Sequence, residues 1–236
     1  MAQALLEVKN LNTGYGDLQI LRDVSLTVNE GEVVALLGSN GAGKSTFMRT
    51  LVGRIRVWSG EVTMKGENLT NALSEKIVQS GISIAPEGRR LFAGMTVTEN
   101  LEMGAFCRRK DIKTRMDKIF QMFPRLYERR NHLAGDLSGG EQQMCSIGRA
   151  LMNEPKVLLI DEFSLGLAPA IVDILINVVN DINKQGVSIL IVEQDVQMVL
   201  DLSTRAYVME VGAITLSGAS RDLLDNPKIK EAYLGM

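Results

Sequence analysis

The chain of 236 residues, 45% of them hydrophobic, has an ordinary globular composition and the length of one sizeable α/β domain. Its net charge of −2 excludes an overall basic field that would attract nucleic acid, and its longest apolar runs are too short to span a bilayer. Cys107 and Cys145 lie far apart and, with the single His132, form no metal or disulfide pattern, which favours a reducing compartment.

The first predicted piece is a hairpin-rich antiparallel segment over residues 5–32. Short runs rich in Val, Ile and Leu then alternate with amphipathic stretches, a pattern typical of a mostly parallel sheet covered by helices. The predicted strands are residues 33–38, 81–86, 157–161 and 188–194. The predicted helices between them are Lys44–Gly53, Gly139–Asn153 and Pro169–Gln185.

The stretch from about Glu87 to Gly135 has no strong strand signal. It contains "VTENLEMGAF" and "DIKTRMDKIFQMFPRLYERR", both of which have helical patterns. We therefore expect a helical subdomain inserted between strands of the sheet.

The segment "GSNGAGKST" matches the phosphate-loop pattern G-x-x-x-x-G-K-[ST] and lies between a predicted strand and a predicted helix, as that motif requires. Its glycines let consecutive backbone N–H groups point at phosphate oxygens, and the helix N-terminus adds a positive dipole end. We expect Lys44 to reach the β- and γ-phosphates and Ser45 to offer its hydroxyl to Mg²⁺. The alternative, a chance glycine-rich turn, would not explain the full spacing. The predicted nucleotide-binding residues here are Gly38, Asn40, Gly41, Ala42, Gly43, Lys44, Ser45 and Thr46.

A second half of the site is predicted at "VLLIDE", an apolar strand that ends in two acidic residues. Asp161 would hold Mg²⁺ through water at the carboxyl edge of the sheet, where open α/β sheets bind ligands. Glu162 would lie beside the γ-phosphate and polarise an attacking water. A helix N-cap is the alternative interpretation, and only the pairing with the phosphate loop makes the nucleotide interpretation strong.

The order "GSNGAGKST", "LSGGEQQ" and "VLLIDE" resembles the ATP-binding cassette family, the ATPase subunits of ABC transporters. The resemblance implies two cassettes facing head to tail, with each ATP held between one chain's phosphate loop and the partner's LSGG loop. The residues that would act in trans are Ser138, Gly139, Gly140 and Glu141. The alternative is that "LSGG" only caps the helix that follows, and we expect that cap in either case.

Two further positions take family roles from the resemblance. Tyr15 matches the aromatic residue that stacks on adenine, although a tyrosine in a hairpin turn is the alternative. Glu87 stands where the family usually has a Gln that contacts Mg²⁺, and its carboxylate is still a hard ligand for that ion.

Three further positions depart from the usual family pattern. Gln194 replaces a His that touches the γ-phosphate, and its amide can donate a hydrogen bond but cannot carry a proton. Glu162 is then the only general base we expect, with Gln194 beside it in the catalytic set. Phe163 and Ala168 replace a usual Pro and Asp in the loop after Glu162, which affects the position of that loop and contacts across the dimer.

The segments "APEGRRLFAGMTVTENLEMGA", "LAGDLSGGEQQM", "DEFSLGLAP" and "LIVEQDV" resemble one of the two ATPase subunits of bacterial high-affinity branched-chain amino acid uptake transporters. This resemblance implies ATP and Mg²⁺ as cofactors and a peripheral location at the cytoplasmic face of the inner membrane. It also implies a second ABC ATPase subunit, identical or different, two membrane permeases, and indirectly a periplasmic solute-binding protein, but no nucleic acid. Glu87–Phe106 is the expected permease contact.

We therefore expect an α/β P-loop NTPase fold with a mostly parallel sheet, an N-terminal antiparallel β piece and an inserted helical subdomain. The single domain 1–236 would divide into a nucleotide-binding core, residues 1–86 and 151–236, and a helical subdomain, residues 87–150, that carries the LSGG loop. The expected function is the ATP-hydrolysing motor of an importer. One alternative, a non-transport ABC ATPase, is disfavoured by the absence of a long coiled-coil insertion, a second cassette or a basic face. The other, a nucleotide-binding regulator without turnover, is disfavoured by Lys44, Asp161 and Glu162.

Overall fold

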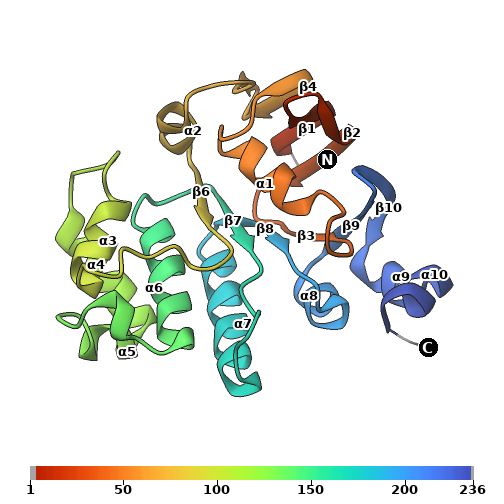
Figure 1. Cartoon of the computed structure of the whole chain (residues 1–236). Helices are drawn as coiled ribbons and strands as arrows, with labels where there is room; N and C mark the ends of the chain where they lie inside the picture. The colour runs from red at the N-terminus through yellow and green to blue at the C-terminus, as the bar shows by residue number, and fades with distance from the viewer. Residues whose placement is uncertain (1–3, 235–236) are drawn as a thin grey trace.

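Two β-sheets form the centre of the computed structural model, which describes residues 4–234 (Figure 1). The antiparallel sheet has the strand order β2-β1-β4-β5, and the larger sheet has the order β10-β9-β3-β8-β7-β6. The strands of the first sheet are β1 Ala4–Tyr15, β2 Leu18–Asn29, β4 Val57–Met64 and β5 Glu67–Asn68. Those of the second are β3 Val33–Leu37, β6 Ile82–Ala85, β7 Val157–Asp161, β8 Ser188–Val192, β9 Arg205–Glu210 and β10 Ala213–Ala219.

The larger sheet is parallel from β9 to β6, and only the edge strand β10 is antiparallel. Every residue of β3, β7 and β8 is buried, because both faces of these strands are covered. The mostly parallel sheet predicted from these apolar runs is therefore confirmed. Parallel strands bring their carboxyl ends to one edge, so the loops after β3, β6, β7 and β8 lie together there.

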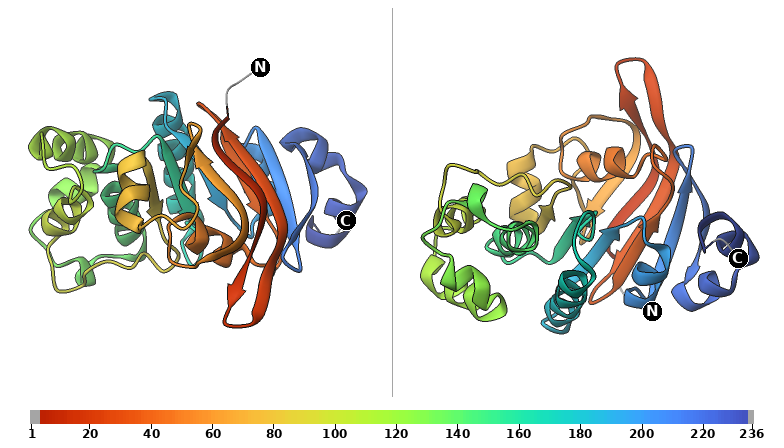
Figure 2. Two further views of the ribbon diagram at one scale, coloured as in Figure 1. Left: turned by 90° about the horizontal axis from the view of Figure 1, so that it is seen from above. Right: turned by 60° about the horizontal axis from the view of Figure 1, so that its bottom comes forward.

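Helices cover the larger sheet and extend beyond one end of it (Figures 1 and 2). The α-helices are α1 Lys44–Leu51, α2 Ser74–Ser80, α3 Val97–Gly104, α4 Ile112–Met122, α5 Pro124–Glu128, α6 Gly139–Leu151, α7 Pro169–Lys184, α8 Val196–Leu202, α9 Ser220–Asp225 and α10 Pro227–Ile229. A 3₁₀ turn spans Ala134–Asp136 and a π-helical turn spans Lys230–Leu234. Within residues 4–234, no helix combines the length and the apolar character that crossing a membrane requires.

Two clusters of buried side chains make up the core, one on each face of the larger sheet. Alternate residues of β3 point to opposite clusters: Val33, Ala35 and Leu37 to one, Val34 and Leu36 to the other. The first cluster runs without a break from the sheet into α3, α4, α6 and α7. The helices between β6 and β7 therefore share their hydrophobic core with the sheet.

The sequence interpretation missed part of the antiparallel sheet. That sheet is completed by β4 and β5, which come after α1 rather than in the N-terminal segment. The segment "VWSGEVTM" alternates poorly because of Gly60, whose φ is 96° and whose missing Cβ would lie 2.3 Å from the carbonyl oxygen of Asn10. The predicted helices were correct, although they ended one or two residues beyond the ends of α1, α6 and α7.

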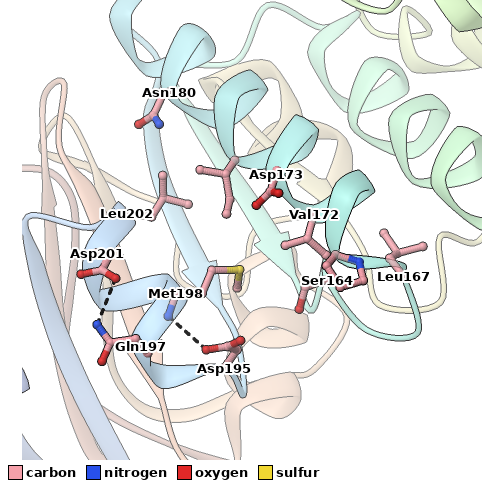
Figure 3. A pocket seen from close by; sticks show the side chains of 12 residues that line it. Ser164, Leu167, Val172, Asp173, Asn180, Asp195, Gln197, Met198, Asp201 and Leu202 are labelled. Atoms are coloured by element: carbon pink, nitrogen blue, oxygen red, sulfur yellow. Dashed lines mark hydrogen bonds between the residues drawn. The ribbon is translucent and has the colours of Figure 1, made fainter.

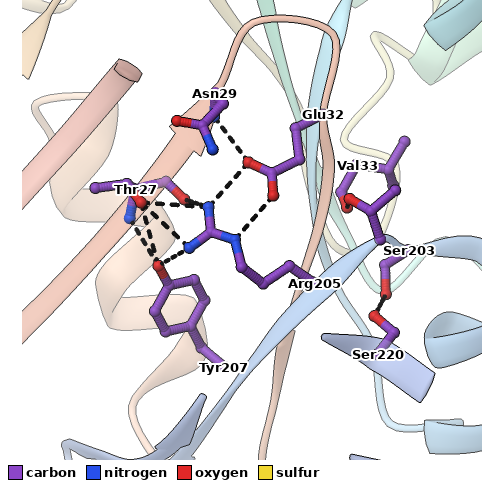
Figure 4. A network of polar contacts seen from close by, with 9 residues as sticks. Thr27, Asn29, Glu32, Val33, Ser203, Arg205, Tyr207 and Ser220 are labelled. Carbon is purple, nitrogen blue, oxygen red and sulfur yellow. Dashed lines mark hydrogen bonds and ion pairs between the residues drawn. The ribbon is translucent and has the colours of Figure 1, made fainter. Parts of the chain in front are cut away.

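A polar network joins the two sheets at the end far from the phosphate loop (Figure 4). Arg205 of β9 forms a bidentate ion pair with Glu32, with Nε–Oε1 at 2.8 Å and Nη2–Oε2 at 2.9 Å. The same guanidinium donates to the carbonyl oxygen of Thr27 on β2 at 2.8 Å and to the hydroxyl of Tyr207. The side chains of Arg205 and Glu32 are only 25% and 13% exposed. Removing either one would therefore leave the other as a largely buried charge without a partner.

Replacing Arg205 with Ala is expected to lower the free energy of unfolding by about 2–3 kcal/mol, because it leaves the largely buried Glu32 carboxylate without its partner. Urea unfolding of the native and variant chains measures this difference. Lys184→Ala, which breaks an exposed pair with Asp181, serves as the control and is expected to cost less than about 0.5 kcal/mol. Equal losses in the two variants would contradict a linking role for Arg205.

Candidate functional site

A pocket of about 590 Å³ lies at the carboxyl ends of the parallel strands. Its walls come from the loops after β3, β6, β7 and β8, the first turn of α1 and one residue of β2. The lining residues are Ile20, Asn40, Gly41, Gly43, Lys44, Ser45, Thr46, Glu87, Glu162, Leu165 and Gln194. All except Ile20 and Leu165 are predicted site residues, so residues far apart in the sequence meet around one cavity.

The phosphate loop curls tightly between β3 and α1. Lys44 Nζ donates to the carbonyl oxygens of Gly38 at 2.6 Å and Ser39 at 3.1 Å, so the ammonium group lies inside the loop. Gly43 has a φ of 112°, and a Cβ at this position would come within 2.9 Å of Leu21. Burial lowers the pKa of Lys44, although nearby carboxylates partly oppose this. No side chain among the described residues caps α1, which leaves its first N–H groups available to an anion.

Asp161 is the last residue of β7 and is only 5% exposed. Its Oδ1 atom is buried and has no hydrogen-bond partner within residues 4–234. Burial, together with the negative charges of Glu87 and Glu162, raises the pKa of Asp161 to about 6. Such a carboxylate is better accommodated when a proton or a cation compensates its charge.

The raised pKa predicts how Asp161 affects stability. Between pH 4 and 6, roughly, the folded chain holds a proton on Asp161 that the unfolded chain has lost, so stability falls as pH rises through that window. Asp161→Asn removes this penalty, and we expect it to raise the free energy of unfolding at pH 8 by about 1–3 kcal/mol. Urea unfolding from pH 4 to 8 measures the difference, with Asp173→Asn on the exposed face of α7 as the control. An Asp161→Asn curve parallel to the native one would contradict this prediction.

Glu162 and Gln194 come together on the pocket wall. Gln194 Nε2 donates to Glu162 Oε1 at 2.8 Å, and the backbone N–H of Glu162 donates to the carbonyl oxygen of Val192 at 2.9 Å. Glu162 has a φ of 49°, in the left-handed region that residues with a Cβ rarely occupy. The sequence predicted that the Gln194 amide would donate to the γ-phosphate. In the structure it donates to the carboxylate of Glu162 instead. The neighbouring Phe163 is 1% exposed and fixes the start of the next loop in the core.

The LSGG loop lies away from this pocket and begins α6. Ser138 and Glu141 form a capping box: the N–H and hydroxyl of Ser138 donate to Glu141 Oε2 at 2.9 and 2.8 Å. The expected cap is therefore confirmed. Gly140 packs against α7, where a Cβ would lie 2.7 Å from Ile171 Cγ2. Ser138, Gly139, Gly140 and Glu141 do not line the pocket of their own chain.

Comparison with known proteins gives the same answer as the motifs. The sequence profile described as "ABC transporter" matches residues 21–164. The chain is also 47% identical to the high-affinity branched-chain amino acid transport ATP-binding protein BraG of Pseudomonas aeruginosa, over 98% of this chain and 100% of that protein. The chain belongs to the ABC transporter family. It is a nucleotide-binding ATPase of that family, as the three motifs predicted.

Other relatives extend the agreement over the whole ABC ATPase. The probable branched-chain amino acid transport ATP-binding protein LivF of Archaeoglobus fulgidus is 33% identical over 98% of this chain and 99% of its own length. The solved ADP conformation of MJ1267, an ATP-binding cassette of an ABC transporter, has a TM-score of 0.89 with 29% identity and covers 99% of this chain and 100% of that one. The predicted fold class is therefore confirmed.

The loop carrying Glu87 connects the pocket of the ABC ATPase to α6. The φ angles of Gly88, Arg89 and Arg90 are 69°, 62° and 45°, so the chain turns sharply after Glu87. The carbonyl oxygen of Arg89 accepts hydrogen bonds from Ser146 Oγ and Arg149 Nη2, both at 3.1 Å. Direct contacts therefore link the loop that carries Glu87 to α6, the helix that follows the LSGG loop.

Tyr15 ends β1 beside the start of α1 and is 46% exposed. Its hydroxyl lies 3.5 Å from Thr46 Oγ1 and accepts a hydrogen bond from Arg49 at 3.2 Å. Ile20, rather than Tyr15, lines the pocket itself. Neither Ile20 nor Leu165 had a signal in the sequence, because a single apolar residue beside a turn resembles any other.

Proposed function

We propose that this ABC ATPase is the motor subunit of an importer of branched-chain amino acids. The observation that carries its catalytic role is the hydrogen bond from Gln194 to Glu162 on the wall of the pocket that Lys44 also lines. The cargo is inferred from BraG and LivF, two relatives whose names both specify branched-chain amino acid transport.

In the proposed reaction, Lys44 pairs with the β- and γ-phosphates of ATP, and the N–H groups at the start of α1 bind phosphate oxygens. Glu162 accepts a proton from the attacking water, and Gln194 holds the Glu162 carboxylate in the required direction. Gln194 has no proton to exchange at neutral pH, so it orients the base rather than replacing it.

Mg²⁺ fits the acidic side of this pocket. Asp161, with its unpartnered buried Oδ1, together with Ser45 and Glu87, would hold the ion. Residues 4–234 contain no group of three His, Cys, Asp or Glu side chains arranged for a metal, so phosphate oxygens and water would supply the other ligands. When bound, Mg²⁺ neutralises charge on the transferring phosphate.

A second ATPase subunit, either a copy of this chain or a different cassette, completes the site in our proposal. Its LSGG loop would present the N–H groups of Gly139 and Gly140 to the γ-phosphate, with Ser138 and Glu141 beside them. The separation of this loop from the pocket of its own chain supports an action in trans. Tyr15 would stack on the adenine ring from its exposed position beside α1.

We also propose that residues 1–86 and 151–236 form the nucleotide-binding core and that residues 87–150 form the helical subdomain. Residues 1–3, 235 and 236 of the proposed core lie outside the described residues. The arrangement of α3, α4 and α5 at one end of the molecule supports this division (Figure 1). A groove of about 390 Å³ between the two parts is lined by Phe92, Met103 and Phe106 among others. These side chains are 47%, 42% and 62% exposed, which suits an apolar segment of a permease.

Through that groove, two membrane permeases would hold the ATPase at the cytoplasmic face of the inner membrane. A periplasmic solute-binding protein would deliver the amino acid to the permeases without touching this chain. Movement of Glu87 on nucleotide binding would reach the groove through the contacts of Arg89 with α6.

Phe106→Asp is expected to lower leucine uptake by at least about 10-fold, because a charge placed in the apolar contact disfavours docking on the permease. ATP binding by the purified chain should stay within about twofold of native, since Phe106 is exposed and outside the pocket. Uptake of labelled leucine in cells whose own copy is replaced by the variant measures the effect. Ile174→Asp, at an equally apolar exposed position on α7, is the matched control.

The same cells test the cargo. Loss of the chain should abolish high-affinity uptake of leucine, isoleucine and valine and leave lysine uptake unchanged. Unchanged uptake of all three branched-chain amino acids would overturn the proposed cargo. Loss of leucine uptake in both Phe106→Asp and Ile174→Asp would overturn the proposed permease surface.

A further inference from the structure

Glu193 is a buried carboxylate to which none of the sequence motifs assigns a role. It lies between Val192, the last residue of β8, and Gln194, and it is 2% exposed. Glu193 Oε1 accepts a hydrogen bond from the backbone N–H of Ser164 at 2.9 Å, and Oε2 accepts one from the backbone N–H of Gln194 at 3.1 Å. Burial raises the pKa of Glu193, and residues 4–234 provide it with no ion-pair partner within 4 Å.

This carboxylate continues the pairing of β7 with β8 beyond the ends of the strands. Asp161 pairs with Val192 in the parallel ladder, and the N–H of Glu162 then donates to the carbonyl oxygen of Val192 at 2.9 Å. Further along the segment that follows β7, the N–H of Ser164 also donates to the segment that follows β8. Its acceptor there is the side chain of Glu193. A side chain therefore replaces a backbone carbonyl as the acceptor where the two segments diverge.

The loop that Glu193 holds has open space on both sides. Leu165 lines the nucleotide pocket, whereas Ser164 and Leu167 line a second pocket of about 640 Å³ between α7 and α8 (Figure 3). Phe163 and Leu167 pack against the core at the two ends of the loop, and Ser164 lies between them beside open space. The hydrogen bond from Ser164 to Glu193 is a specific contact that ties it to the segment carrying Gln194.

We propose that Glu193 is a positioning residue for ATP hydrolysis, whose buried carboxylate holds the backbones of Ser164 and Gln194 so that the Gln194 amide meets Glu162. This inference rests on the proposed roles of Glu162 and Gln194. Glu193 touches neither the nucleotide pocket nor the reacting atoms; it acts through the backbone of Gln194. This role requires both carboxylate oxygens as acceptors, because one accepts the N–H of Ser164 and the other the N–H of Gln194.

Glu193→Gln tests the requirement for two acceptors. The amide has one acceptor oxygen, and its NH₂ group would face the second backbone N–H, so two donors would oppose each other. We expect kcat for ATP hydrolysis to fall by about 10- to 100-fold, the range for a misplaced catalytic group. The KM for ATP should stay within about threefold, because the phosphate loop is unchanged. Initial rates of phosphate release by the full chain across a range of MgATP concentrations measure both constants.

A double-mutant cycle separates positioning from general stability. If Glu193 acts through Gln194, the Glu193→Gln/Gln194→Ala double variant should have a kcat within about twofold of Gln194→Ala alone. Glu32→Gln is the matched control, a carboxylate-to-amide change at the opposite end of the sheet, which should lower the melting temperature but leave kcat unchanged. Multiplicative losses in the double variant, or a native kcat in Glu193→Gln, would overturn the inference.

If Glu193→Gln does not fold, Glu193→Asp provides the second variant, because it keeps the carboxylate but is one methylene too short to reach both N–H groups. Hydrogen exchange of the segments 162–166 and 192–195 should then rise in the variant, and unchanged exchange would overturn the inference. Glu162→Gln distinguishes failure of the proposed general base from failure of the positioning role of Glu193. A native hydrolysis rate in Glu162→Gln would defeat the proposed role of Glu162 itself, whereas a native rate in Glu193→Gln alone would defeat only the positioning role.

Discussion

Replacing Glu162 with Gln is expected to lower kcat for ATP hydrolysis by about 10²- to 10⁴-fold, the usual contribution of a general base. The amide has nearly the same shape as the carboxylate but cannot accept the proton of the attacking water. We propose Glu162 as the base because Gln194, its hydrogen-bond partner, has no basic group and Asp161 is buried. Phosphate release at saturating MgATP measures the loss.

ATP binding by Glu162→Gln should stay within about threefold of native, because Lys44 and the phosphate loop are untouched. Equal, background rates for the native and variant chains would instead favour the regulator without turnover. The same variant tests the trans arrangement, since blocked hydrolysis stabilises any dimer that shares ATP. In light scattering with MgATP, a dimer would show that two copies of this chain pair, and a monomer that binds ATP would indicate a different cassette as partner.

Lys44→Ala is expected to raise the Kd for ATP by about 10- to 100-fold, because a hydrogen bond to a charged group contributes about 1.5–3 kcal/mol. The ammonium group is held inside the loop by the carbonyl oxygens of Gly38 and Ser39, so it needs little reordering to meet a phosphate. Its loss also removes a positive charge that lies close to the carboxylates of Asp161 and Glu162.

Equilibrium dialysis with labelled ATP measures the affinity of Lys44→Ala, and Lys184→Ala on the exposed end of α7 is the control for charge alone. A native Kd for ATP in Lys44→Ala would contradict the role of Lys44. A comparable increase in both would indicate a general electrostatic effect, which salt titration would then reveal.

The sequence predicted those features whose local pattern has only one physical solution. Residues 157–160 are all apolar, as a strand covered on both faces requires, and all five residues of β7 are buried. The phosphate loop was predictable because its spacing and its glycine conformations belong together, as the φ of 112° at Gly43 illustrates. The family followed from the order of three such motifs.

Features that depend on contacts between distant segments were not predictable. The sequence of β4 does not reveal that it extends the first hairpin, because the partner strand decides whether its polar residues face solvent. The direction of the Gln194 amide depends on where the chain leaves β8. Glu193 fell inside the predicted strand 188–194 without any signal of its role, since its partner Ser164 lies 29 positions away.

Glu162 has a φ of 49°, so the residue proposed as the general base also occupies a backbone conformation that lowers the stability of the fold. A residue with a Cβ in this region of conformational space costs about 1–2 kcal/mol relative to glycine. Laboratory evolution for heat resistance alone should therefore favour Gly or Asn at position 162 and yield hardier chains that no longer turn over ATP. In a parallel selection that requires ATP hydrolysis, the glutamate should be retained at position 162 in spite of this cost.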